Sequence, residues 1–311
     1  MVGEEQLFAQ VVEYPDPDAQ HRLASLVGLD EFRQRLVDEA ALLIDPSAIS
    51  AWTARHHGVT LRAAAEVSHR TPLIVLAGDV GTGKTELAET FADEVARRLR
   101  IDMTLYSLSL TARGRGAVGE MTTLLSAAFA TLSQAGRACR SRDGRINRGI
   151  VLLVDEGDAL AQSRELSQMH HEDRAGVNAL IRGIDELRHA SLPVLTVICT
   201  NRPNAIDPAV RRRAAALFHL TRPDDLQREE ILTSLLSGVG FTPHEMAQLV
   251  AATGPTKART FGFTFSDIRQ RLLPEAVLRC VRTDVPLTAD AVIEATRWIE
   301  ATRPFDEEAS R

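Results

Sequence analysis

The residues from Gly78 to Thr85 (GDVGTGKT) have the types and the spacing that bind the phosphate groups of a nucleotide. They fit the pattern G-x-x-x-x-G-K-[ST], in which glycines leave room for backbone N–H groups to surround the phosphates. In this pattern Lys84 reaches the β and γ phosphates, and the hydroxyl of Thr85 binds Mg²⁺. The predicted ligands of this loop are ATP and Mg²⁺, and its predicted binding residues are Gly78, Asp79, Val80, Gly81, Thr82, Gly83, Lys84 and Thr85.

A second group of chemically active residues, the acidic pair Asp155 and Glu156, follows the apolar run 150–154. Such a run is typical of a strand buried on both faces of a parallel sheet. About 70 residues after a phosphate-binding loop, the pair predicts a nucleotide hydrolase, with Asp155 holding Mg²⁺ and Glu156 activating the attacking water. Taken alone, the pair is also compatible with a strand that ends in a solvated acidic turn.

Three further residues complete the predicted catalytic set. Asn201 follows the apolar run 193–199, where an amide can hydrogen-bond the γ-phosphate or the water beside it. Arg212 and Arg213 precede the last predicted strand. They are either solvated charge or the arginines that a ring-forming ATPase presents to the nucleotide of the neighbouring subunit.

The elements that must position these residues alternate between strand and helix patterns. We expect strands at 73–77, 103–110, 150–154, 193–199 and 214–220, and a helix over 30–44 that begins at Asp30. The polar segment 52–70 is expected to be a loop, on which His56 and His57 are solvated or packed rather than metal-bound. After residue 222 the pattern is helical only, with helices expected at 225–236, 243–252, 266–281 (kinked at Pro274) and 288–302 (with Thr288 as its N-cap).

These patterns divide the chain into four parts. We expect an extended N-terminal arm at 1–21, a large α/β domain at 22–222, a small helical domain at 223–303 and a tail at 304–311. The formal net charge of −6 argues against a generally basic surface for nucleic acids. No apolar run approaches the roughly 18 residues of a membrane span, so we expect a cytoplasmic protein. Three scattered cysteines, Cys139, Cys199 and Cys280, favour neither a disulfide framework nor a zinc site.

Two arginine-rich stretches, at 113–115 and 137–148, allow a second interpretation. They are typical either of solvated loops or of a local patch for nucleic acid, although no aromatic residue lies between the arginines of 137–148 to stack on bases.

Together these features resemble the AAA+ ATPase family over roughly residues 22–302. The resemblance rests on the loop at 78–85, Asp155 and Glu156, Asn201, the arginine cluster 211–213 and four C-terminal helices. It implies an α/β P-loop fold with a five-stranded parallel sheet followed by a small all-helical lid domain, assembled into homohexameric rings. It also implies that adenine lies near Val27 and Gly28, that Arg213 is the arginine finger with Arg212 second, and that Arg269 or Arg271 is the nucleotide-sensing arginine of the lid.

Within that family, the chain looks most similar to the pachytene-checkpoint (thyroid hormone receptor interactor 13) branch. This likeness rests on the segment 174–185, Thr200-Asn201, Ile206-Asp207 and Arg213. Members of that branch remodel HORMA-domain proteins, and bacterial members serve in anti-phage signalling. The resemblance implies substrate contacts in a central pore at Val118, Gly119 and His170. An alanine, Ala117, stands where many AAA+ unfoldases have an aromatic residue, and the separate N-terminal domain of eukaryotic members is not expected.

The sequence therefore predicts an ATPase that couples hydrolysis to remodelling of a protein partner, here a HORMA-domain protein. Two other classes remain open. One is a DNA-directed AAA+ ATPase of the initiator or helicase-loader type, and the other is a nucleotide-dependent scaffold that does no mechanical work.

Overall fold

The computed structural model describes residues 7–59, 61–108, 120–157, 171–202, 206–257 and 259–305. The chain forms two compact units. The first, called the sheet unit, comprises Met1–Ala24, Phe32–Ala77 and Thr85–His219. The second, called the helical unit, comprises Ser25–Glu31, Gly78–Lys84 and Leu220–Arg311. The phosphate-binding loop thus packs with the C-terminal helices.

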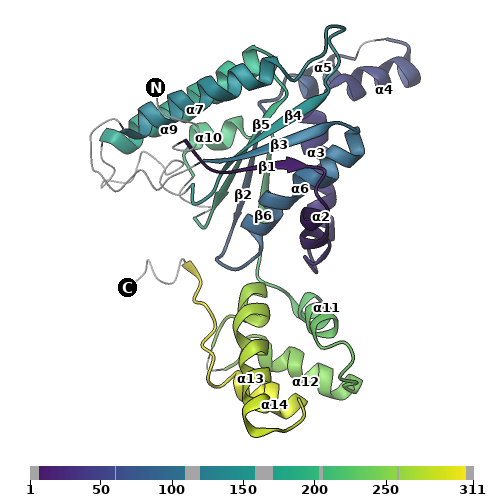
Figure 1. The fold of residues 1–311 in the computed structure, drawn as a ribbon, viewed down its shortest axis with the longest axis vertical. Coiled ribbons are helices and arrows are strands. Elements are labelled where there is room, and N and C mark those ends of the chain that lie inside the picture. The colour runs from purple at the N-terminus through teal and green to yellow at the C-terminus, as the bar shows by residue number, and fades with distance from the viewer. Residues whose placement is uncertain are drawn as a thin grey trace. The chain divides into compact units, whose positions relative to one another are not determined.

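A six-stranded sheet with the order β1-β3-β4-β5-β2-β6 runs through the described residues (Figure 1). Its strands are β1 (Phe8–Tyr14), β2 (Leu73–Gly78), β3 (Asp102–Leu108), β4 (Arg148–Val154), β5 (Val194–Thr200) and β6 (Ala216–Leu220). The pairs β3–β4, β4–β5 and β2–β5 are parallel, whereas β1 runs antiparallel to β3. The five predicted strands are all present, and β1 adds a sixth at the edge.

The central strands are buried on both faces. Every residue of β2 and β5 is buried, as is all of β4 after its first residue. Alternate strand residues, such as Val75, Leu152 and Ile198, belong to a core cluster shared with apolar residues of α7 (Glu120–Arg137), α9 (His171–His189) and α10 (Pro208–Arg213). Two-sided burial explains why these strands are continuous apolar runs in the sequence.

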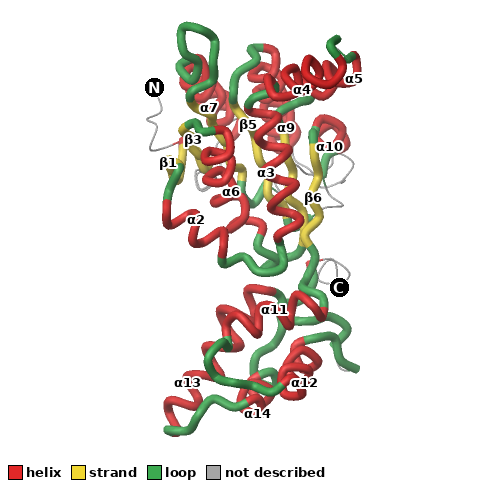
Figure 2. The backbone as a smooth tube through the Cα atoms, turned by 90° about the vertical axis from the view of Figure 1, so that its right-hand side faces the viewer, coloured by secondary structure: helices red, strands yellow, loops and turns green. Residues whose placement is uncertain are grey.

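Helices cover both faces of the sheet. Figures 1 and 2 show α7 and α9 side by side on one face, and α3 (Asp30–Ile44) and α6 (Lys84–Leu99) on the other. The segment expected as an extended arm contains strand β1, which is paired with β3 in the sheet, and α2 (Pro17–Ala24) follows it.

Specific polar contacts hold this N-terminal segment against α6. The Tyr14 hydroxyl donates a hydrogen bond to the carbonyl of Glu89, and burial, followed by the charge of Glu89, raises the pKa of Tyr14. Arg22 binds the carboxylates of Glu86 (2.7 Å) and Glu89 (2.6 Å). The partners lie more than 60 residues away along the chain, so no local pattern indicates this pairing.

The expectation of a loop over 52–70 is wrong. Two helices occupy the region, α4 (Ser47–His57) and α5 (Arg62–Ser68), with His56 and His57 in the last turn of α4. Thr53 is the buried residue of α4 and Ala64 that of α5. Because so little of each helix is buried, neither has the apolar periodicity from which helices are predicted.

The helical unit packs its own core around Phe263, Leu249 and Leu272. Its elements are α11 (Asp225–Leu235), α12 (Pro243–Thr253), a π-helical segment η3 (Asp267–Leu272), α13 (Leu273–Thr283) and α14 (Ala289–Ala295). The helix expected over 266–281 thus begins as η3, and Pro274 lies in the first turn of α13, where its missing N–H is tolerated. Thr288 is the N-cap of α14, as predicted, but α14 ends at Ala295 rather than near 302.

A buried carboxylate, that of Asp267, organises this unit. It accepts hydrogen bonds from the backbone N–H of Thr264 (3.1 Å), the N–H and hydroxyl of Thr302 (3.0 and 2.7 Å) and the guanidinium of Arg271 (2.9 Å). Burial acts to raise the pKa of Asp267, but the hydrogen bonds from Thr264 and Thr302 outweigh it and hold the pKa below its usual value.

Replacing Asp267 by Asn should therefore destabilise the helical unit by about 3 kcal/mol at neutral pH, because charged hydrogen bonds are lost and an amide donor faces the Thr302 N–H. The folded-state pKa lies below the unfolded value near 4, so the contribution is complete above about pH 4 and disappears as the pH falls through the folded value. Urea unfolding from pH 7 to pH 3 measures this. A stability difference that stays constant over that range would contradict the assignment.

Candidate nucleotide-binding site

The phosphate-binding loop leaves β2 at Gly78 and enters α6 at Lys84. Gly81 has φ +76°, and a Cβ there would lie 2.5 Å from the hydroxyl oxygen of Thr264. A Cβ on Gly78 would lie 2.1 Å from the carbonyl oxygen of Leu220. The loop can follow this path only with glycine at both positions, although the motif itself requires glycine only at the first of them.

Hydrogen bonds within the loop converge on the backbone carbonyl of Asp79. Lys84 Nζ donates to it at 2.7 Å, and the Thr82 hydroxyl donates at 2.8 Å. The Lys84 residue is only 6% exposed, so its ammonium is held against the loop backbone. The Asp79 carboxylate faces Arg222, with its Oδ2 2.7 Å from Nε and 2.5 Å from Nη2. Val80, the next residue after Asp79 in the loop, is exposed.

The acidic pair lies where β4 ends. Asp155 Oδ1 accepts the backbone N–H of Glu156 at 2.9 Å, and Glu156 has a positive φ of 50°. A non-glycine residue at positive φ is uncommon and clusters at functional sites. The Glu156 side chain is exposed, and the N–H of Gly157 donates to the carbonyl of Cys199 at 2.8 Å, which fixes the turn to β5.

Parallel pairing brings further predicted residues to the same edge of the sheet unit. Val154 pairs with Ile198, and Ala77 pairs with Thr200, so β2, β4 and β5 all end at one edge. Asn201 follows β5 directly there. Thr85 lies exposed in the first turn of α6. The oxygens of the Thr85 hydroxyl and the Asp155 carboxylate are donors that suit Mg²⁺.

The two finger candidates differ in their surroundings. Arg213, at the end of α10, pairs with Asp185 of α9, with Nε 3.2 Å from Oδ2, and donates Nη1 to the carbonyl of Ala209 at 3.3 Å. Arg212 beside it is exposed. Asp185 therefore orients the Arg213 guanidinium, a relation that sequence reasoning missed.

The residues predicted to lie near adenine and the predicted nucleotide-sensing arginines of the lid all belong to the helical unit. The carbonyl of Gly28 accepts a hydrogen bond from Gln227 Nε2 at 2.6 Å, and Val27 packs against the core cluster of the unit. Arg269 is exposed, and its Nη1 donates to the Ser25 hydroxyl at 3.2 Å. Arg271 instead pairs with Asp267. Arg269 thus lies beside the segment that contains Val27 and Gly28.

The predicted pore residues Val118, Gly119 and His170 lie outside the described residues. The same is true of Arg113 and Arg115 in the first arginine-rich stretch. In the second stretch, Arg140 donates to the carbonyls of Gly144 (3.1 Å) and Ser191 (2.9 Å).

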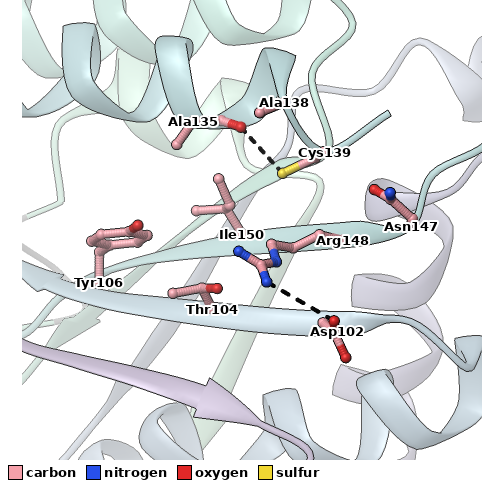
Figure 3. Close-up of a pocket in the computed structure, with 9 residues that line it drawn as sticks. All are labelled: Asp102, Thr104, Tyr106, Ala135, Ala138, Cys139, Asn147, Arg148 and Ile150. Carbon is pink, nitrogen blue, oxygen red and sulfur yellow. Dashed lines mark hydrogen bonds and ion pairs between the residues drawn. The ribbon is translucent and has the colours of Figure 1, made fainter. Parts of the chain in front are cut away.

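A cavity of about 390 Å³ lies at the opposite ends of β3 and β4, beside their first residues Asp102 and Arg148 (Figure 3). These two side chains form an ion pair at 3.9 Å. Cys139 lines the cavity, donates its thiol to the carbonyl of Ala135 at 3.3 Å, and has a pKa raised by burial. The cavity is separate from the strand ends that carry Asp155 and Asn201.

Comparisons with known proteins show the family of the chain. Residues 74–222 match the family described as ATPase family associated with various cellular activities (AAA). The chain is 51% identical over 300 residues to CD-NTase-associated protein 6 of Escherichia coli (strain MS 115-1), covering 96% of this chain and 95% of the relative. The chain belongs to the AAA ATPase family.

This AAA ATPase is similar in structure to solved bacterial Trip13 proteins. A chain of the E. coli MS115-1 HORMA:CdnC:Trip13 complex matches with a TM-score of 0.91 and 46% identity, covering 98% of this chain and 99% of that one. The structure of Rhizobiales Trip13 matches with a TM-score of 0.75 and 42% identity, covering 96% and 100%. Among the described residues of this AAA ATPase, no helix is both long and apolar enough to cross a membrane.

Replacing Gly81 by Ala should weaken nucleotide binding about tenfold or more, because the new methyl group would meet Thr264 and displace the loop. Titration with a fluorescent ATP analogue measures the change. Gly144→Ala is the matched control, since Gly144 also has a positive φ (83°) but has no atom within 4 Å of the added Cβ. Equal loss of affinity in the two variants would contradict the steric argument.

Proposed function

We propose that this chain hydrolyses ATP and uses the reaction to remodel a HORMA-domain protein in bacterial anti-phage signalling. The observation that carries the proposal is the match, over nearly the full length of both chains, to a chain of the HORMA:CdnC:Trip13 complex. The glycine-dependent phosphate loop and the acids at the end of β4 supply the ATPase chemistry that remodelling requires. The coupling to a partner rests on the likeness to the Trip13 proteins.

In this proposal each residue at the strand ends has a role set by its chemistry. Lys84 binds the β and γ phosphates, and Thr85 and Asp155 hold Mg²⁺, which neutralises phosphate charge when bound. Glu156 accepts the proton of the attacking water, a role that suits an exposed carboxylate at the end of a strand. Asn201 positions that water or the γ-phosphate.

The remaining parts act around this centre. Residues 22–222 are the ATPase domain and 223–303 the lid, in which Val27, Gly28 and Arg269 contact the nucleotide. Six copies form a ring, and Arg213, oriented by Asp185, reaches the nucleotide of the next subunit. Val118, Gly119 and His170 contact the substrate in the pore.

Replacing Glu156 by Gln should preserve ATP binding and lower kcat by at least about a hundredfold, because an amide cannot accept the proton of water. ATP-binding titrations and steady-state phosphate release measure the two properties. Glu229→Gln, on the exposed face of α11, is the matched control and should leave both unchanged. Substantial turnover in Glu156→Gln would refute its role as the base.

The same Glu156→Gln variant serves as a substrate trap. With ATP in a lysate of the source cells, the tagged variant should retain a HORMA-domain protein that survives nuclease treatment. Captured nucleic acid without protein, lost on nuclease treatment, would instead favour the DNA-directed class.

Mixing subunits tests the role of Arg213 in trans. Glu156→Gln and Arg213→Ala proteins should each be nearly inactive. A 1:1 mixture should recover about a quarter of wild-type turnover, because about one interface in four joins an intact Glu156 to an intact Arg213. Phosphate release after subunit exchange measures this. A mixture with no more activity than its components would contradict the role in trans and place Arg213 at the nucleotide of its own subunit.

A further inference from the structure

The side chain of Asp79 connects the phosphate loop to the beginning of the C-terminal helical region. Its carboxylate contacts two nitrogens of Arg222, at 2.7 and 2.5 Å, and the two side chains are only 17% and 14% exposed. Nothing in the phosphate-binding motif requires an acid at this position, because the motif allows any residue there. A largely buried charge pair at such a position calls for a separate explanation.

Arg222 also contacts other segments of the helical unit. Its Nη1 donates to the carbonyl of Gly262 at 2.9 Å and to the carbonyl of Thr302 at 2.7 Å. Its guanidinium also lies 5.1 Å from the centre of the Phe261 ring. One side chain therefore joins the loop to the start, the middle and the end of the chain segment that forms the helices.

Other contacts follow the same route. The N–H of Ser266 donates to the carbonyl of Gly81 at 3.2 Å, and the N–H of Phe305 donates to the Asp79 carboxylate at 3.3 Å. The backbone carbonyl of Asp79 holds Lys84 Nζ at 2.7 Å. Asp79 is thus bonded through its backbone to the lysine that binds phosphate and through its side chain to Arg222.

We propose that Asp79 and Arg222 are positioning residues that transmit the nucleotide state of the phosphate loop to residues 222–305. The inference rests on the proposed ATPase function. Hydrogen bonds weaken steeply with distance and angle, so a shift of the loop that accompanies phosphate binding must either carry Arg222 with it or break its bonds. Breaking them would leave a charge with few contacts to water, so the movement is transmitted.

Hydrogen exchange with and without ATP, measured in the Glu156→Gln background, tests the link. In the parent protein, ATP should slow exchange in 78–85 and also in 259–305. The motif surrounds phosphate with backbone N–H groups, which both substitutions keep, so in Asp79→Asn and Arg222→Gln ATP should still protect 78–85. The exchange rate of 259–305 in the presence of ATP should instead be at least about fivefold higher than in the parent protein. The double variant should behave like either single one, because the residues act as a pair.

The control variant is Arg279→Gln. It removes an arginine of the same unit that, in the described part of the chain, forms ion pairs with Glu275 (3.5 Å) and Glu294 (3.6 Å) and not with the loop, and it should keep both protected regions. Arg222→Lys retains the charge without the planar fork and should restore transmission only in part. If a single variant fails to fold, the double variant, which buries no unpaired charge, supplies the same comparison.

The outcomes separate this inference from the function on which it rests. ATP-dependent protection of 259–305 that persists in Asp79→Asn and Arg222→Gln would overturn the inference and leave the pair as a structural contact. Protection confined to 78–85 in the parent protein would also overturn it, while leaving ATP binding intact. Absence of protection in both regions of the parent protein would refute the ATPase proposal itself.

Discussion

Parallel pairing of β2, β4 and β5 is the constraint on which the arrangement of the site depends. Parallel strands end at the same edge, so the ends of β2, β4 and β5, after which the loop, the acids and Asn201 follow in the chain, lie together although they are far apart in the sequence. The pairing requires strands buried on both faces, and that burial keeps charged residues out of the buried run of each strand. The first polar residues after each strand therefore become the chemical groups of the site.

This relation explains which parts of the fold could be predicted. The central strands β2, β4 and β5 are apolar runs because both of their faces are covered. These three strands, together with β3 and β6, were all predicted. Strand β1 is different: its burial pattern is mostly exposed between Phe8 and Tyr14, and it is fixed by distant partners on β3 and α6. Helices α4 and α5 bury so few side chains that their sequences show no apolar helical periodicity. Local sequence predicts an element only where burial imposes a pattern.

The same distinction applies to the site. Residue types at fixed spacing predicted the loop, and the positions of Gly78 and Gly81 in the structure give the steric reason for each glycine. The roles of Glu156, Asn201 and Arg213 stay predictions, although the structure places the first two at the expected strand ends. Partners distant in the sequence were not predictable. Asp185 beside Arg213 and Arg222 beside Asp79 are 28 and 143 residues away, and no spacing rule connects them.

Asp79 contacts two cationic side chains, Lys84 and Arg222, and the chemistry of each suits a different role. Lys84 offers a compact ammonium on a flexible stem, which can leave the Asp79 carbonyl for a phosphate without reorganising a planar group. Arg222 offers several donors in a fixed plane, so it can bind a carboxylate and two carbonyls while its face lies near Phe261. A lysine at 222 could not hold all of these partners at once. Asp79 thus contacts two different cations. Lys84 is suited to move, and Arg222 is suited to hold separate chain segments together.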